Sequence, residues 1–134
     1  MSAVISASLL PDPPPRRHEE DDLQMAVVGF LRWSLPDDAT FTHIPLGGQR
    51  HKRAAQRLVG LGTKAGWPDL LIVHQGRALF IELKAPGGAL SAVQKQAIAK
   101  LIYCGAEVLV CRSVPEVEAA LREAGVPLRA SLNA

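Results

Sequence analysis

Two short apolar runs, residues 68–73 and 78–84, are separated by only four residues, His74-Gln75-Gly76-Arg77. Runs of this length that favour β-structure, joined by a short linker containing glycine, are typical of a β-hairpin. Apolar side chains occur on both faces of each run, so we expect other elements to cover the hairpin on both sides. The chain is therefore predicted to fold around a sheet that contains this hairpin.

The segments before and after the hairpin show helical and strand patterns. Apolar spacing, capping residues and β-favouring runs predict a helix at 19–34, a strand at 40–44, a short helix at 54–62, a helix opened by a Ser91/Gln94 capping box and ending near Cys104, a strand at 107–111, and a last helix from Ser113 to about Gly125. This order predicts an α/β fold with a mixed sheet of about four strands flanked by helices.

The length of the chain, 134 residues, fits one compact domain and leaves no room for two. Four prolines fall within residues 11–15. We therefore expect residues 1–17 to form a flexible, Pro-rich N-terminal arm. The folded domain is predicted to occupy residues 18–126, with a C-terminal tail at 127–134.

The sequence contains no stretch that approaches the ~18–20 consecutive apolar residues of a membrane span, and its start lacks the pattern of a signal peptide. We therefore expect a soluble intracellular protein with no membrane partner. The two cysteines, Cys104 and Cys111, are too few for a disulfide scaffold or a cysteine-based zinc site. Both are expected to pack as small hydrophobic residues.

The formal net charge of +2 hides an uneven distribution of charge. No acidic residue occurs between Ala39 and Pro68, and this stretch contains a basic patch made of Arg50, Lys52, Arg53, Arg57 and Lys64. Cations interleaved with glycines suit contacts with DNA phosphates, and an ordinary solvated surface would show the same pattern. His43 and His51 lie near the basic patch and are assigned no catalytic role.

The hairpin has a chemical consequence if its turn is centred on Gln75 and Gly76. Asp69 then lies directly opposite Glu82, and Lys84 shares the face of Glu82. Directly opposed side chains have Cβ atoms ~4.5–5.5 Å apart, so the two carboxylates repel unless a cation lies between them. Oxygen ligands favour Mg²⁺, and a nearby lysine would activate a water or stabilise charge on a phosphate. This combination indicates phosphodiester hydrolysis.

A structural interpretation of the same residues stays open at this point. Glu82 and Lys84 would be polar residues of a strand at the edge of the sheet, joined in an ion pair, and Asp69 would cap a turn after Pro68. The choice depends on the assumed position of the hairpin turn.

Flanking motifs extend the pattern. Gly66-Trp67-Pro68-Asp69, followed after twelve residues by Glu82-Leu83-Lys84, resembles the PD-(D/E)XK nuclease signature. The chain is most similar to the virus-type replication-repair nuclease (VRR-NUC) family, in its stand-alone phage and bacterial form. Further matches are Glu20 with Leu23-Gln24, His43-Ile44-Pro45 with Gly47-Gly48 and Arg50, and Leu90-Ser91 with Gln94-Lys95. The resemblance implies a restriction-endonuclease-like core.

The resemblance also implies roles for individual residues. Asp69 and Glu82 would hold Mg²⁺ or Mn²⁺, with the backbone carbonyl of Leu83 as a further ligand, and Lys84 would be the catalytic lysine. Glu20 would approach the metal from the first helix, although Glu19, Asp21 and Asp22 are neighbouring choices and all four carboxylates suit a helix N-terminus. Gln94 would act beside the metal as a catalytic residue, or serve only as the capping partner of Ser91. Leu46 departs from the family pattern, in which a polar residue often precedes the glycines.

These observations lead to a functional hypothesis. The protein is expected to be a metal-dependent endodeoxyribonuclease acting in replication, repair or recombination in the cytoplasm of a bacterium or phage-infected cell. No recognition helix or zinc finger predicts sequence specificity, and the family suggests branched substrates such as four-way (Holliday) junctions. The alternatives are a restriction-type endonuclease and an inactive DNA-binding module of the same fold. The presence of Asp69, Glu82 and Lys84 together argues against the inactive module.

A homodimer is expected because symmetrical cutting of a four-way junction needs two metal sites and one chain offers one. The first helix has apolar residues around more of its circumference than one buried stripe requires, and Trp33 could anchor a partner. The alternative is that Met25, Val28 and Trp33 complete the core.

Overall fold

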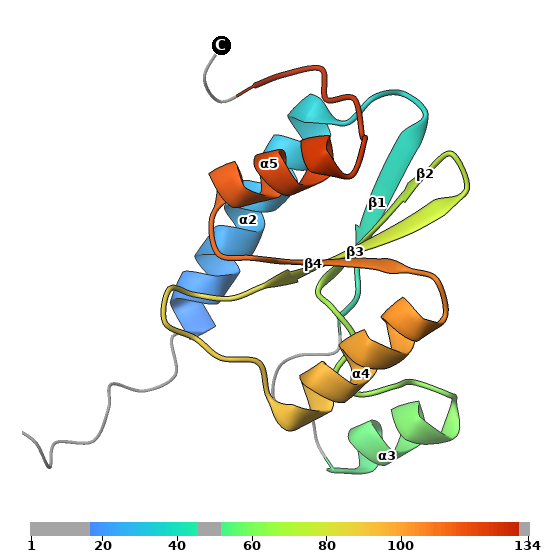
Figure 1. Cartoon of the computed structure of the whole chain (residues 1–134). Helices are drawn as coiled ribbons and strands as arrows, with labels where there is room; N and C mark the ends of the chain where they lie inside the picture. The colour runs from blue at the N-terminus through green and yellow to red at the C-terminus, as the bar shows by residue number, and fades with distance from the viewer. Residues whose placement is uncertain (1–16, 46–51, 132–134) are drawn as a thin grey trace, which may run out of the picture.

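The computed structural model describes residues 17–45 and 52–131, which form a four-stranded mixed sheet with helices on both sides (Figure 1). The elements in chain order are α2 (Arg17–Ser34), β1 (Ala39–His43), α3 (Lys52–Gly60), β2 (Leu70–His74), β3 (Arg77–Leu83), α4 (Ala92–Tyr103), β4 (Glu107–Cys111) and α5 (Val114–Glu123). The predicted α/β class and the mixed four-stranded sheet are confirmed. None of the described helices combines the length and apolar character needed to cross a bilayer.

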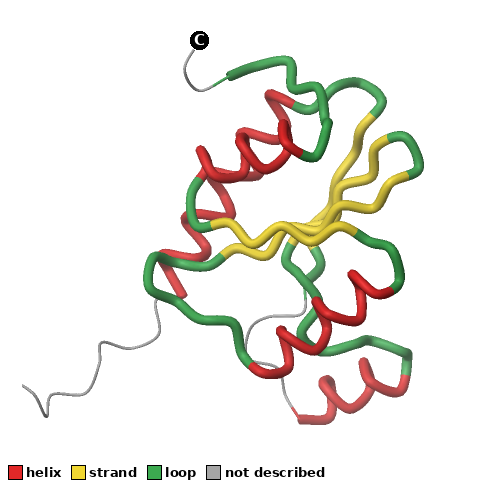
Figure 2. The backbone as a smooth tube through the Cα atoms, viewed as in Figure 1, coloured by secondary structure: helices red, strands yellow, loops and turns green. Residues whose placement is uncertain are grey.

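The strands follow the order β1-β2-β3-β4 across the sheet. The first two neighbouring pairs are antiparallel and β3 pairs with β4 in parallel. Figure 2 shows the four strands of the twisted sheet in yellow. The β2–β3 turn contains Gln75 and Gly76, both with positive φ, 50° and 76°. A two-residue turn with positive φ at both positions has a backbone twist that matches the right-handed twist of the flanking strands. The turn pairs His74 with Arg77 and Leu70 with Ile81, which is the predicted register.

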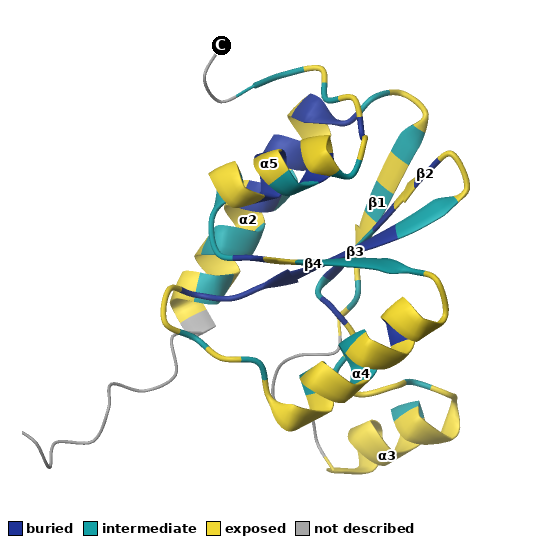
Figure 3. Ribbon diagram, in the orientation of Figure 1, coloured by how far each residue is buried: buried dark blue, intermediate teal, exposed yellow. Residues whose placement is uncertain are grey.

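One face of the sheet is covered by α2 and α5, which lie together on the same side (Figure 1). The core forms here because the apolar stripes of both helices meet alternate residues of the strands. Its fully buried members include Val27, Leu31, Leu70, Ile72, Leu79, Ile81, Val117 and Leu121. Burial of each such side chain contributes about 1.5–3 kcal/mol. Figure 3 shows these buried parts of α2, α5 and the inner strands in dark blue.

The opposite face is covered only in part, in contrast to the expectation of two covered faces. Leu101 of α4 is buried, and Trp67 packs edge-on against Phe80 of β3. Val73 and Val110 on this face remain 41% and 40% exposed. Leu101 is the one buried residue of α4, and α3 has no buried residue (Figure 3).

Helix termini agree with their capping signals. The side chain of Ser91 accepts a hydrogen bond from the Gln94 N–H, and the Gln94 side chain accepts one from the Ser91 N–H, so the capping box is formed. Ser113 caps α5 through its side chain, which accepts a hydrogen bond from the Glu116 N–H. Cys111 is buried, as expected, whereas Cys104 is exposed because it is the C-cap residue at the outer end of α4. The expectation that both cysteines are packed was therefore wrong for Cys104.

The residues after α5 return to the domain. Val126 is buried and Leu128 packs against the core. The Arg129 N–H donates to the Ser34 carbonyl at 2.7 Å, and the Arg129 guanidinium pairs with Asp37 at 3.1 Å. The chain from 126 to 129 is thus tied to the C-terminal end of α2. The predicted arm, apart from Arg17, and residues 132–134 of the predicted tail lie outside the described residues.

Candidate active site

Asp69 and Glu82 lie at the point where the β2–β3 hairpin ends. Glu82 is in β3 and only 2% exposed, and Asp69 directly precedes β2, one position beyond the Leu70–Ile81 pair. The Asp69 carboxylate accepts a hydrogen bond from the Leu83 N–H at 2.7 Å. Asp69 therefore bonds across the hairpin and does not cap a turn after Pro68. The two carboxylates belong to one site, as the register predicted.

The electrostatics of the two carboxylates are unfavourable in the absence of a cation. Burial, with the nearby charge of Asp69, raises the pKa of Glu82 from 4.5 to about 8. Burial also raises the pKa of Asp69, against the opposing effect of the Leu83 hydrogen bond. Lys84 acts to lower the pKa of both groups. A bound cation would favour both ionised forms.

Lys84 directly follows β3, and its N–H donates to the Cys111 carbonyl at 3.0 Å. β3 lies between β2 and β4, so neither Glu82 nor Lys84 is on a strand at the edge of the sheet. Within residues 17–45 and 52–131, no ion pair joins Glu82 to Lys84. The structural alternative for these residues was therefore wrong. Lys84 is instead a lysine 9% exposed beside the buried Glu82 and the half-buried Asp69.

Gln94 is the capping partner of Ser91 and also contacts the acidic pair, so it is not only a capping residue. Its Oε1 accepts from the Ser91 N–H at 2.9 Å, which completes the capping box. Its Nε2 donates to Glu82 Oε1 at 3.1 Å. One amide group thus joins the first turn of α4 to the acidic pair, and the cap fixes the direction in which the amide points.

Glu20 approaches the acidic pair from the first turn of α2. Its charge contributes to the raised pKa of both Asp69 and Glu82. Its Oε1 also lies 3.8 Å from where a Cβ on Gly88 would be, so it is beside the loop that follows Lys84. Glu19, Asp21 and Asp22 are exposed. Among the four acidic residues, Glu20 is therefore the one that the structure brings to the site.

His43 and Gln24 also belong to this site. His43 Nδ1 lies 2.8 Å from the Asp69 carbonyl oxygen and 3.0 Å from Gln24 Nε2. A single ring nitrogen either donates to the carbonyl or accepts from the amide, so the tautomer decides which bond is made. The charge of His43 acts to lower the pKa of Asp69. The sequence matched His43 and Gln24 to the family pattern and gave His43 no catalytic role, but it did not predict that the two meet at Asp69. The available signal was the position of Gln24, one helical turn after Glu20 and on the same helix face.

Arg112 is a residue that the sequence did not single out. Its Nη1 donates to the carbonyls of Ala85 and Gly88, at 2.9 and 2.6 Å. These carbonyls belong to the loop between Lys84 and α4, so Arg112 holds the loop that connects Lys84 to Gln94. No local pattern marks such a residue, because its partners are more than twenty positions away.

The basic patch lies in and after α3. Lys52, Arg53, Arg57 and Lys64 are exposed, and the first turn of α3 contains no acidic residue. Arg50, the remaining member, lies outside the described residues, as do His51 and Leu46. The described part of the basic patch is therefore solvated and free to meet a polyanion.

The residues present fit a hard divalent cation. In the described ranges, no three His, Cys, Asp or Glu side chains are grouped closely enough to hold a metal ion by themselves. Asp69 and Glu82 supply two carboxylates, and Mg²⁺ is usually bound through one or two carboxylates while it keeps several waters. The raised pKa of Glu82 is a second sign, because a cation would relieve the repulsion that causes part of it.

Comparisons with known proteins agree with this geometry. Solved structures with the same fold include a "VRR_NUC domain protein", 24% identical with a TM-score of 0.60, which covers 78% of this chain and 86% of its own. Another, titled "VRR_NUC domain", is 20% identical with a TM-score of 0.52 and covers 78% of this chain and 95% of its own. A search of curated proteins found no match. The family model described as the VRR-NUC domain matches residues 19–115, which include the acidic pair, Lys84 and Gln94. The chain therefore belongs to the VRR-NUC domain family, a family of nuclease-type domains.

Proposed function

We propose that this protein is a metal-dependent endodeoxyribonuclease that hydrolyses phosphodiester bonds in DNA. The observation that carries the proposal is the placement of Asp69 and Glu82 together at the end of the hairpin, with the pKa of Glu82 raised to about 8. A buried and a half-buried carboxylate at one place are costly unless they have a task that needs them. Membership of a nuclease-type family supports the same conclusion.

The proposed chemistry assigns a task to each residue of the site. A divalent cation held by Asp69 and Glu82, with the Leu83 carbonyl as the expected backbone ligand, would supply Lewis-acid stabilisation of a phosphate and a water of lowered pKa. Lys84, fixed by its backbone bond to Cys111, would offer a positive charge to the phosphate as negative charge develops there. Gln94 would hold the Glu82 carboxylate in one orientation through its Nε2. Glu20 would add a further oxygen from α2.

The proposed substrate is branched DNA, with four-way junctions as the leading example, cut without sequence preference. The exposed basic patch supports contact with DNA backbones, because Lys and Arg bind phosphates whatever the sequence. Action as a homodimer in the cytoplasm of a bacterium or phage-infected cell belongs to the same proposal.

The test is cleavage of linear, flapped and four-way DNA by the purified protein, with Mg²⁺, with Mn²⁺ and with EDTA. We expect cutting of branched DNA that depends on the metal, and its loss in Asp69→Asn and in Glu82→Gln. Asp69→Asn keeps an oxygen for the Leu83 N–H, so loss of cleavage cannot be attributed to a broken hairpin. Wild-type cleavage by both variants would refute the site, and reproducible cutting at one short sequence in linear duplex would instead identify a restriction-type enzyme.

A further inference from the structure

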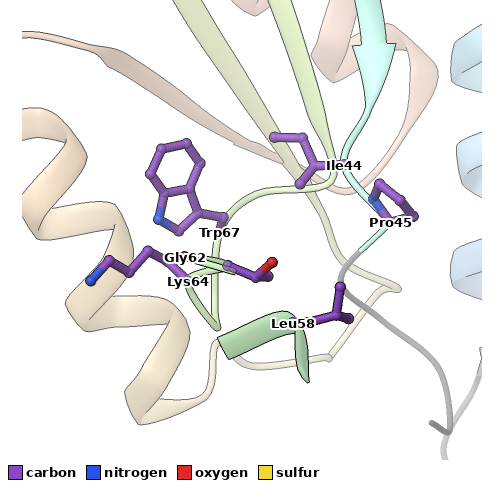
Figure 4. A pocket seen from close by; sticks show the side chains of 7 residues that line it. Ile44, Pro45, Leu58, Gly62, Lys64 and Trp67 are labelled. Carbon is purple, nitrogen blue, oxygen red and sulfur yellow. The ribbon is translucent and has the colours of Figure 1, made fainter. Parts of the chain in front are cut away.

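A hollow of about 420 Å³ lies between the end of β1, α3 and the loop that leads to Asp69. Its apolar lining comes from Ile44, Pro45, Leu58 and Trp67, and Thr63 and Lys64 add polar groups. In Figure 4, Trp67 and Lys64 lie on one side of the hollow and Pro45 and Leu58 on the other. The volume is within the ~300–1,000 Å³ of pockets that hold small ligands.

The hollow is joined to the acidic pair through the backbone. The Ile44 N–H donates to the Asp69 carbonyl at 2.7 Å, so one wall is bonded to the residue that would hold the metal. Trp67 is only two residues before Asp69, and Pro68 between them is fully buried. A group bound in the hollow would therefore lie next to DNA at the proposed site.

Trp67 is held in place and still presents surface. Its indole packs at 89° against the ring of Phe80, with 5.5 Å between the ring centroids. The residue nevertheless remains 36% exposed and lines the hollow. An aromatic ring fixed by one contact and open on another side is the usual platform on which a nucleobase stacks.

The charges around the hollow favour the same ligand. Lys64 is exposed where it lines the hollow, and Arg57 is exposed on α3, one residue before Leu58. The sequence has no acidic residue from Ala39 to Pro68 that could oppose them. An apolar slot with cations at its rim matches a nucleotide, in which an aromatic base is attached to an anionic phosphate.

From these observations we propose that the hollow binds one unpaired nucleobase of the DNA, stacked on Trp67, with the adjoining phosphate at Lys64. The inference rests on the proposed function and adds a reason for preferring branched DNA. A base at a branch or in a single strand leaves its stack at the lowest cost, whereas a base in intact duplex must first be unpaired. The hollow would therefore select DNA by the availability of a free base, without reading its identity.

A neighbouring hollow of about 510 Å³ shares Trp67 and Lys64 but extends over α4, where Val93 and Ala97 line it. It lacks Ile44, and with it the backbone bond to Asp69. The two positions can be separated because each has a small residue of its own that a phenylalanine would enlarge. Thr63→Phe narrows the first hollow and Ala97→Phe narrows the second.

The experiment measures binding without cleavage, in a Glu82→Gln background with EDTA. A labelled DNA flap carries an abasic nucleotide that is moved one position at a time through the single strand. We expect one position at which removal of the base weakens binding about tenfold, the size of one stacked base. In Trp67→Leu the same abasic change should have no effect, and Trp67→Phe should restore it. Tyr103→Leu, which removes an aromatic residue that is 86% exposed, is the matched control and should behave as the parent.

The outcomes separate this inference from the nuclease assignment. An abasic penalty that persists in Trp67→Leu, or is absent at every position, overturns the base pocket even if the unmodified protein cuts branched DNA with Mg²⁺. Should Trp67→Leu fail to fold by circular dichroism, Thr63→Phe decides: loss of the abasic penalty supports the pocket and its retention refutes it. If the abasic penalty is lost in Ala97→Phe and retained in Thr63→Phe, the base binds in the second hollow, and the proposal is also overturned.

Discussion

Glu82 has surroundings that are costly for a carboxylate, because it is buried in a central strand with Asp69 and Glu20 nearby. Its pKa of about 8 in the folded protein exceeds its ordinary value of 4.5. Between these two pH values the folded protein retains a proton that the unfolded chain releases. Stability therefore falls as pH rises from about 4.5 to 8, at up to about 1.4 kcal/mol per pH unit, and levels off above that range.

Glu82→Gln should remove this contribution, because glutamine does not ionise and can still accept the bond from Gln94. We expect the variant to equal the wild type in stability near pH 4 and to exceed it at pH 9. Thermal melts in EDTA across this range provide the measurement. Added Mg²⁺ should stabilise the wild type most at high pH, where no proton has to be displaced. A wild-type stability that stays constant or rises between pH 5 and 8 would contradict the raised pKa of Glu82.

Lys84→Met should lower kcat far more than it lowers DNA affinity, since a charge beside the reacting phosphate acts mainly on the transition state. Methionine keeps the buried stem, so the fold should persist. Single-turnover cleavage of four-way DNA gives the cleavage rate constant, and equilibrium binding of the same DNA in the same buffer gives the affinity. Equal losses in both would indicate that Lys84 only helps to bind DNA.

The sequence predicted the spatial neighbours of some site residues and not those of others. The placement of Asp69 beside Glu82 followed from one local fact, the two-residue turn at Gln75 and Gly76, because a turn sets the register of its strands. The contacts of His43 with Asp69 and of Arg112 with Ala85 and Gly88 depend on how distant elements meet. No local period or cap encodes such meetings, so these contacts appeared only in the structure.

At the scale of elements, α3 is a basic helix without a buried residue, and its task is expected to be electrostatic. Neutralising Lys52, Arg53 and Arg57 together should weaken DNA binding and flatten its dependence on salt. For each phosphate that the protein no longer neutralises, the slope of log K against log salt falls by about 0.9 on duplex DNA. Arg32→Gln, which removes an exposed cation at the end of α2, is the control. An unchanged slope in the triple variant would exclude the described part of the basic patch as the DNA-binding surface.

The loop between α3 and β2 is held against α4 by a glycine. Gly66 has φ +81°, and a Cβ at this position would lie 2.6 Å from the Val93 carbonyl oxygen. Gly66→Ala should therefore destabilise the protein by at least ~1–3 kcal/mol and displace Asp69, three residues on. Gly29→Ala is the control: a Cβ there meets nothing within 4 Å, and alanine in a helix should stabilise by roughly 0.5–1 kcal/mol. Thermal melts of the two variants should shift in opposite directions, and a neutral Gly66→Ala would refute the close approach.

The elements themselves were largely readable from the sequence. Strand 107–111 and the capping box at Ser91 and Gln94 were placed as the structure has them, because caps and turns are local. The sequence did not show how much of the second face of the sheet is covered by helices. Apolar residues such as Val73 look the same in sequence whether a helix covers them or not, and Val73 is 41% exposed.

At the scale of the whole molecule, α2 leaves large apolar side chains of the single chain exposed to water. Val28 packs against the core, whereas Met25 and Trp33 are 66% and 74% exposed. The alternative that all three complete the core is therefore wrong for Met25 and Trp33, which lie on the same side of the helix. Large apolar side chains left in water at one place favour a protein partner, and aromatic residues contribute most to such contacts.

A homodimer through this side of α2 would supply what a four-way junction requires. One chain holds one acidic pair, and a two-fold axis would present two of them to a substrate with similar symmetry. Light scattering at micromolar concentration should give a mass near twice that of the 14.4 kDa chain. Trp33→Glu should give the monomer and convert paired nicks on a junction into single ones, because the two sites no longer act in one binding event. Tyr103→Glu, at another exposed aromatic residue, should leave the dimer intact. A wild-type monomer that makes both nicks before it dissociates would refute the dimer and its link to symmetrical cutting.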